Sequence, residues 1–159
     1  MTEKVSEILE KIGDCYNTLA AHYEAMEHDT MQSERVAQVS RYLSEWERVR
    51  AVQLNTRLKD SGYKDVLATW LKERPSVPND LDISSDDFEF KQQLTNEVHT
   101  EESLMAVLSK RHNFIADTYR KLATVVSCEK LQELFTTLAD DELLEVKRAI
   151  RNIQAFEFV

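Results

Sequence analysis

Cys15-Tyr16-Asn17-Thr18-Leu19-Ala20-Ala21-His22-Tyr23 is matched about 96 residues later by Arg111-His112-Asn113-Phe114-Ile115-Ala116-Asp117-Thr118-Tyr119. The two stretches share an asparagine, an alanine and a tyrosine in register, and a leucine in the first copy faces an isoleucine in the second. A second pair of matching stretches follows at nearly the same offset, Tyr42-Leu43-Ser44-Glu45-Trp46-Glu47 and Thr137-Leu138-Ala139-Asp140-Asp141-Glu142. Two copies of a helix pair predict a pseudo-symmetric four-helix bundle, in which function lies on the facing inner positions.

The composition favours one all-α domain over residues 1–159. The chain has only two glycines and two prolines, too few turn formers for a many-stranded sheet. Twenty basic residues against 29 acidic ones give a net charge of −9. A basic face for nucleic acid or anionic lipid is therefore not expected, and we predict neither partner. No apolar signal core or long apolar run occurs, so the expected compartment is the cytoplasm.

Helical periodicity divides the chain into four parts. We predict a helix pair at about 3–58, a long crossover at about 59–99, a second helix pair at about 100–153 and an apolar tail at 154–159. Ser33 and Thr100 are suited to cap the second and third helices. The predicted buried stripes include Val49 and Val52 on the second helix and Leu144 on the fourth. The apolar tail is expected to dock on the bundle or on a second subunit, and a homodimer is the expected assembly.

The order helix, helix, long crossover, helix, helix resembles the ferritin-like superfamily, and specifically its rubrerythrin-like branch. Local sequence agrees over three stretches, Thr100-Glu101-Glu102-Ser103-Leu104, Tyr119-Arg120-Lys121-Leu122-Ala123 and Leu134-Phe135-Thr136-Thr137-Leu138-Ala139-Asp140-Asp141-Glu142. The resemblance covers about four-fifths of the chain. It implies a ferritin-like four-helix bundle with a long crossover between helices 2 and 3, and a role in iron handling or stress.

In that family, the first and third helices each carry a Glu seven residues before a Tyr, and the second and fourth each carry Glu-x-x-His. Residues three apart share a helix face, so each pair directs a carboxylate and an imidazole into one cavity. This sequence departs from the family pattern at four of the six positions. Tyr16 and His112 stand where the first two Glu residues are expected, and Arg50 and Glu145 stand where the two His residues are expected. The resemblance therefore implies an incomplete di-iron set.

Three interpretations of the inner positions remain open. In the first, metal is lost and Arg50 pairs with Glu142 or Glu145, with His112 and Tyr16 satisfying the remaining groups. Tyr23 and Tyr119 belong to the same polar network. In the second, one site for iron, manganese or zinc persists, with the ligands Glu47, His112, Glu142 and Glu145. In the third, the register differs by a turn, and the relevant acids are drawn from Glu24, Glu27, Glu45, Glu97 and Asp141.

The first interpretation predicts a protein without a cofactor, with a non-catalytic or weak metal-binding role. The second predicts a metal-dependent oxidoreductase that acts on oxygen or peroxide. A further alternative is a helical adaptor for an unidentified protein partner, with an apolar patch around Trp70 or around Phe156 and Phe158. Phosphate loops, nucleophile elbows and zinc-ribbon spacings are absent from the sequence, so nucleotide-dependent chemistry is not expected.

Overall fold

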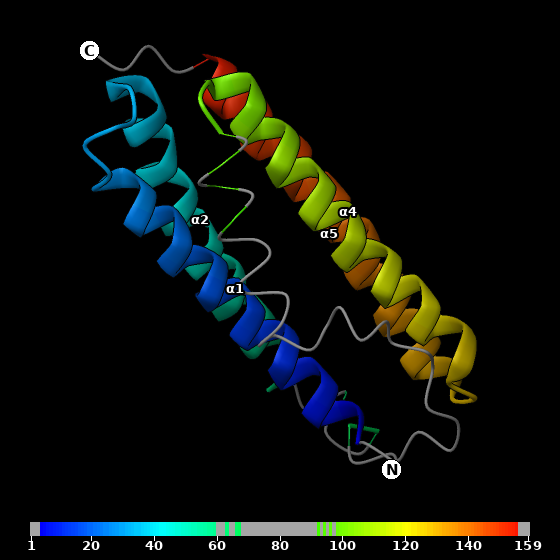
Figure 1. Ribbon diagram of the computed structural model, residues 1–159. Helices are drawn as coiled ribbons and strands as arrows, with labels where there is room; N and C mark the ends of the chain where they lie inside the picture. Colours follow the sequence, from blue (N-terminus) through cyan, green and yellow to red (C-terminus); the bar gives the residue numbers. More distant parts are fainter. Residues whose placement is uncertain are drawn as a thin grey trace.

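The structure, a computed structural model, describes residues 4–59, 63, 66–67, 92, 94, 96 and 98–155. These residues form four helices and no strands: α1 (Val5–Glu27), α2 (Glu34–Leu58), α4 (Glu101–Val125) and α5 (Glu129–Ala155) (Figure 1). The predicted all-α class and the four-helix arrangement are therefore confirmed. The predicted crossover falls almost entirely outside the described residues, as do Trp70, Phe156 and Phe158.

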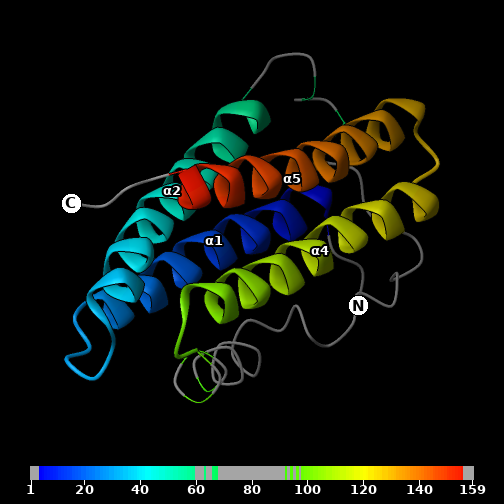
Figure 2. The same ribbon diagram turned by 90° about the horizontal axis from the view of Figure 1, so that it is seen from above.

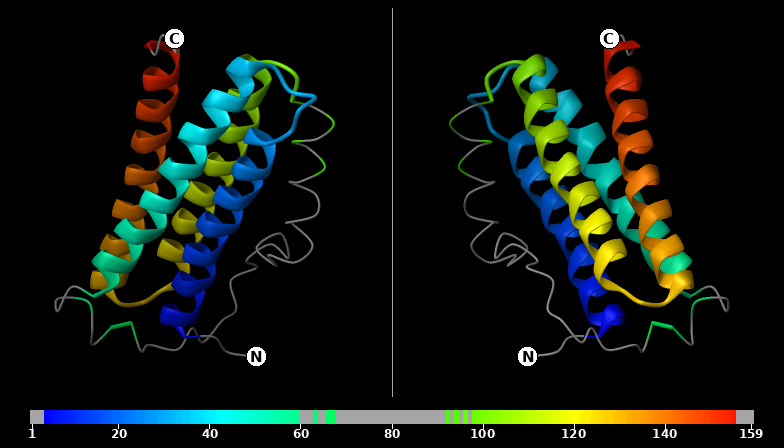
Figure 3. Two further views of the ribbon diagram at one scale, coloured as in Figure 1. Left: turned by 90° about the vertical axis from the view of Figure 1, so that its left-hand side faces the viewer. Right: turned by 90° about the vertical axis from the view of Figure 1, so that its right-hand side faces the viewer.

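The helices are arranged as two antiparallel hairpins, α1 with α2 and α4 with α5, lying alongside each other (Figures 1 and 2). Helices α2 and α4 run in the same direction along the bundle (Figure 3). Their first turns are joined by Arg35, whose Nε and Nη2 each donate to a Glu101 carboxylate oxygen at 2.8 Å. Arg35 Nη2 also donates to the carbonyl of Ile153 at 2.8 Å. One guanidinium therefore ties the two hairpins together at one end of the bundle.

Polar caps begin two of the helices where the sequence places them. Ser33 Oγ accepts from the amide of Val36 at 3.2 Å at the start of α2. Thr100 Oγ1 accepts from the amide of Ser103 at 3.1 Å, and the Ser103 hydroxyl accepts from the Thr100 amide at 3.0 Å. These bonds satisfy amide groups that have no partner within the helix.

Three aliphatic side chains that the pattern assigned to the core are exposed instead. Val49, Val52 and Leu144 retain 52%, 64% and 46% of their surface in contact with solvent. Val49 follows the buried Glu47 by two residues, and Leu144 follows the buried Glu142 by two residues. Two residues correspond to about 200° of helical rotation, so a carboxylate that faces inward turns these side chains outward. On α2 and α5, the faces that carry Glu47 and Glu142 are thus the faces turned inward.

Candidate functional site

Six polar or ionisable side chains from all four helices meet in the middle of the bundle. We call them the inner cluster: Tyr16 on α1, Glu47 and Arg50 on α2, His112 and Tyr119 on α4, and Glu142 on α5. Spacings of three or seven residues place the members from one helix on a common face. Arg50 keeps 11% of its side-chain surface, whereas Tyr16 and Tyr119 keep 1% and the other three keep none. The cluster is therefore nearly sealed from solvent.

His112 lies between two carboxylates and contacts both. Its Nε2 lies 2.5 Å from Glu47 Oε1, and its Nδ1 lies within hydrogen-bond distance of Glu142 Oε1. The Trp46 ring meets the imidazole edge-on at a centroid distance of 4.9 Å. The Tyr16 ring lies nearly parallel to the imidazole, with centroids 6.1 Å apart. The imidazole thus bridges α2 and α5 and is held between two aromatic rings.

Glu142 accepts hydrogen bonds at both of its oxygens. Oε2 accepts from the Tyr16 hydroxyl, and also from Arg50 Nη2 at 2.8 Å. The Tyr16 and Tyr119 hydroxyl oxygens are 3.4 Å apart. Since Tyr16 has one hydroxyl proton and donates it to Glu142, the proton between the two tyrosines comes from Tyr119. Donation therefore runs from Tyr119 to Tyr16 to Glu142.

Burial and charge act in opposite directions on the three central titratable groups. Burial opposes the charge on His112, but the Glu47 and Glu142 carboxylates outweigh it and raise the pKa of His112 to about 9. Burial likewise disfavours the Glu142 carboxylate, yet His112, Arg50 and Tyr16 together lower the pKa of that group. For Glu47, burial wins over the attraction of His112, and the pKa of this carboxyl is raised. The imidazole of His112 is consequently protonated at neutral pH, and each of its ring nitrogens faces a carboxylate.

The remaining groups keep their ordinary charge states. Burial raises the pKa of Tyr16 and of Tyr119, so both phenols stay neutral. Burial disfavours the Arg50 cation, but Glu142 more than compensates and raises the pKa of the guanidinium. Two cations, His112 and Arg50, therefore face two carboxylates, Glu47 and Glu142. The cluster balances its own charge, as buried ions require.

Two polar atoms of the cluster, Glu47 Oε2 and Arg50 Nε, are buried and have no hydrogen-bond partner among the residues that the structure describes. The fully buried Tyr23, two turns beyond Tyr16 on α1, belongs to the same region, and its pKa is raised by burial and then by the Glu47 charge. Glu47 thus carries the least satisfied carboxylate of the site, which agrees with its raised pKa.

Glu145, a predicted metal ligand, lies apart from the buried network. Its carboxylate accepts from Arg148 Nη1 at 2.8 Å, one turn away on the same helix, and a quarter of its side chain is exposed (25%). Arg50 therefore pairs with Glu142, the alternative that the sequence left open beside Glu145. The other three predicted ligands, Glu47, His112 and Glu142, do come together.

The acids suggested by a shifted register pair with arginines on the outside of the bundle. The pairs are Glu24 with Arg48 at 2.6 Å, Glu27 with Arg41 at 4.0 Å, Glu45 with Arg41 at 3.8 Å, and Asp141 with Arg57 at 2.9 Å. Glu97 lies outside the described residues. The register taken from the internal match is therefore the one that fills the bundle centre.

The arrangement does not suit a metal ion. Within residues 4–59 and 98–155 and the few described between them, no three His, Cys, Asp or Glu side chains are placed to hold one. The reason is the bridging imidazole, because its two ring nitrogens point to different carboxylates on opposite sides. Metal ligands must instead converge on one point. Arg50 also donates to Glu142 Oε2, so both oxygens of this carboxylate are already bonded to cationic side chains.

Some features of the site could not be found from the sequence. The contact of Trp46 with His112 is one, although its place directly before Glu47 put it near the site. The sharing of Glu142 by Tyr16, Arg50 and His112 is another, since sequence gives faces but not partners.

None of the described helices combines the length and apolar character needed to cross a bilayer.

Comparisons with known proteins do not add to this description. No protein-family model matches the chain, and neither the curated proteins nor the solved structures that were searched gave a significant match.

Proposed function

We propose that this protein is a ferritin-like, rubrerythrin-like bundle protein whose inner site is closed by its own cations and serves a non-catalytic role. The observation that carries the proposal is the position of His112, which spans Glu47 and Glu142 with both ring nitrogens. Arg50 completes the set from α2. These two cations take the place that metal charge has in the active members of that superfamily.

The chain path supports the ferritin-like assignment. Because α2 and α4 run in the same direction, the end of α2 at Leu58 and the start of α4 at Glu101 lie at opposite ends of the bundle (Figure 3). A single long crossover of this kind is typical of ferritin-like bundles, whereas an up-down-up-down bundle uses short loops.

The burial pattern supports the internal repeat on which the assignment depends. Both copies expose the shared asparagine and bury the same four inward positions: Tyr16 and His112, Leu19 and Ile115, Ala20 and Ala116, and Tyr23 and Tyr119. In the second pair of stretches, Glu47 and Glu142 are both fully buried. Matched burial is expected if two copies of one helix pair face each other across a pseudo-twofold axis.

Charge balance explains why a metal is disfavoured. A divalent ion bound to His112 would require loss of the imidazole proton, whose pKa is raised to about 9. It would also have to displace Arg50, whose charge cannot be removed by deprotonation. Metal binding at neutral pH therefore costs the site two hydrogen-bonded cations. The expected result is weak binding or none.

The test is elemental analysis for iron, manganese and zinc on protein purified without chelator and without a metal-binding tag. We expect amounts far below one metal per chain, and little change after anaerobic loading. Nitrogen-15 NMR at pH 7 should find both ring nitrogens of His112 protonated, which a metal-bound or neutral imidazole does not allow.

Three variants make the test specific. His112→Ala and Glu142→Ala remove the proposed centre, whereas His99→Ala removes an exposed histidine elsewhere. Near-stoichiometric metal that disappears in the first two variants and persists in the third would overturn the proposal. It would favour the rival function, a metal-dependent oxidoreductase with Glu47, His112 and Glu142 as ligands.

A further inference from the structure

A slot of about 550 Å³ opens between α2 and α5, next to the inner cluster. Tyr16, Tyr119 and Arg50 line it, so the outer side of the cluster forms part of its wall. This volume lies within the range of pockets that hold small molecules. The slot is thus a route by which a small molecule can approach three members of the cluster.

Aliphatic side chains form the second part of the wall. Leu54 and Leu138 are buried, whereas Val52 and Leu144 are 64% and 46% exposed. Exposed aliphatic groups beside a hollow gain free energy when an apolar molecule covers them. One part of the ligand should therefore be apolar.

The charged groups of the slot are predominantly cationic. Three arginines, Arg50, Arg57 and Arg148, line it together with two acids, Asp141 and Glu145. The lining thus has one more basic than acidic residue, in a chain with a net charge of −9, and each of the three arginines is paired with a carboxylate. Guanidinium groups bind carboxylates with paired, directional hydrogen bonds.

The arginines have capacity for another acceptor. Arg57 and Arg148 form partly exposed pairs with Asp141 and Glu145, and such surface pairs contribute little stability and rearrange easily. The partner of Arg50, Glu142, is shared with His112. Arg50 donates to Glu142 through Nη2, and the same guanidinium forms part of the wall of the slot.

We propose that this slot binds a small carboxylic acid with an apolar body. Its carboxylate pairs with the arginines, and its hydrocarbon part covers Leu144, Val52 and Leu138. The site goes beyond the proposed function, and it does not depend on whether the inner cluster binds metal.

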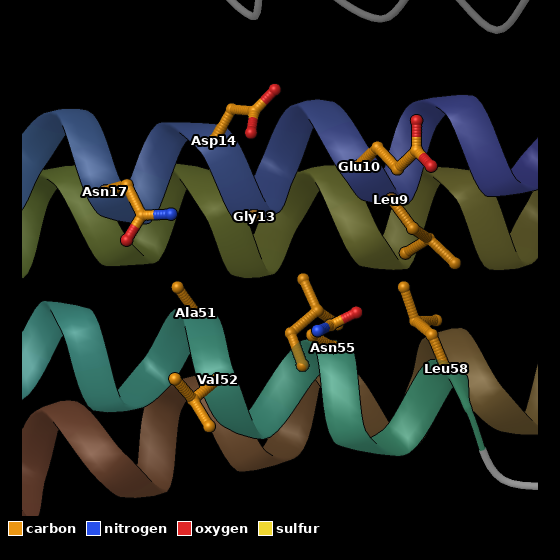
Figure 4. A pocket seen from close by; sticks show the side chains of 10 residues that line it. Leu9, Glu10, Gly13, Asp14, Asn17, Ala51, Val52, Asn55 and Leu58 are labelled. Carbon is orange, nitrogen blue, oxygen red and sulfur yellow. The ribbon is translucent and has the colours of Figure 1, made fainter.

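A second hollow, of about 360 Å³ between α1 and α2, provides a contrast within the same molecule (Figure 4). The described residues of its lining include the acids Glu10 and Asp14 and no basic residue. An anion would be repelled there, although apolar side chains such as Leu9 and Leu58 are also present. The charge of the lining, more than the presence of a hollow, therefore makes the slot between α2 and α5 the better site for an anion.

The experiment is a calorimetric titration of the full chain with octanoate, and with octanol and acetate as comparators. Octanoate should bind saturably at one site, octanol more weakly, and acetate not measurably. Arg148→Ala should weaken octanoate binding by about tenfold, the effect of one lost charge-assisted hydrogen bond. Leu144→Asp should weaken it at least as much, because it places a negative charge at the slot.

Matched variants separate the slot from the rest of the surface. Arg120→Ala removes an arginine with a comparable partner three residues away, and Val49→Asp adds a charge at an exposed valine; neither residue lines the slot. Both should bind octanoate as the unaltered protein does, with thermal unfolding confirming that every variant is folded.

Absence of saturable binding would overturn the proposal, as would equal weakening by the control variants. Equal affinity for octanol would refute the role of the arginines. A dimer in sedimentation that becomes a monomer only in Leu144→Asp would also overturn it, because a second copy would then cover the slot. A metal found at the inner cluster would contradict the proposed function alone.

Discussion

The protein should lose stability as the pH rises from about 6.5 to about 9, because of His112. The pKa of His112 is raised from 6.5 to about 9 in the folded state by Glu47 and Glu142, despite burial. A raised folded pKa means that the native state keeps a proton which the unfolded chain releases. The stabilisation is therefore complete below pH 6.5 and is lost as the pH rises through about 9.

The size of the loss follows from the two pKa values. Each pH unit between them corresponds to about 1.4 kcal/mol. The interval from 6.5 to about 9 therefore corresponds to a loss on the order of 3 kcal/mol. His112 is fully buried, so solvent screening does not reduce this value.

Among the groups around His112, Glu47 has a pKa that is raised by burial, so it contributes a loss of stability of the same sign as the pH rises. The other neighbouring groups titrate outside this interval. Glu142 has a lowered pKa and Tyr16 a raised one, so both keep their charge states from pH 6.5 to 9. Arg50 stays charged throughout. Burial raises the pKa of Cys15 to about 11, and this group remains in the variant as well, so it cancels in a comparison.

The assay is urea unfolding at half-unit steps from pH 6 to pH 9.5, for the unaltered protein, His112→Gln and His99→Gln. The unaltered protein and His99→Gln should show the same decline, and His112→Gln should lack it. Parallel profiles for all three proteins would refute the reasoning. If His112→Gln does not fold, an NMR titration of His112 decides instead, and a pKa near 6.5 would refute it.

Three further predictions concern the helices and a buried thiol. Gly13→Ala should stabilise the protein by about 0.5–1 kcal/mol in urea unfolding. The reason is that an added Cβ meets only Leu54 Cδ2, at 3.9 Å, and the backbone at Gly13 needs no positive φ. A loss of stability would mean that the helix cannot accept a methyl group there. Thr100→Ala should cost about 1 kcal/mol by removing the cap on the Ser103 amide, whereas Thr100→Ser should keep most of it; equal stability of the two variants would exclude the cap. Cys15 should react with a thiol reagent only on unfolding, since it is buried and its pKa is raised to about 11; rapid labelling of native protein, absent in Cys15→Ala, would contradict this.

The helices and most of the inner cluster could be predicted because both depend on periodicity. The matching stretches and the resemblance to the rubrerythrin-like pattern predicted Tyr16, Glu47, His112 and Glu142 as inner positions, and spacings of three and seven residues keep their partners on the same helix faces. The matching stretches then fix which faces meet. Periodicity within a single helix was not sufficient on α2 and α5, where it assigned Val49, Val52 and Leu144 to the core although they are exposed.

The partner of Arg50 could not be predicted in the same way. Glu142 and Glu145 are three residues apart and share a face of α5, so periodicity allows either. A small rotation of α5 decides between them, and it brings Glu142 to Arg50 while Glu145 reaches Arg148. Such rotations depend on the packing of the whole core, which a single helix does not encode.

The closed inner cluster and the exposed slot follow from one choice of helix register. Buried ion pairs add little net stability, because desolvation offsets their attraction. We infer that their effect here is on orientation. When Glu142 faces the centre to meet His112 and Arg50, Leu144 must face outward, where it lines the slot. Arg50, one turn beyond Glu47, then reaches the cluster and the slot at once. Replacing Glu47, His112 and Glu142 with apolar side chains would therefore remove the constraint that keeps Leu144 and Arg50 at the slot.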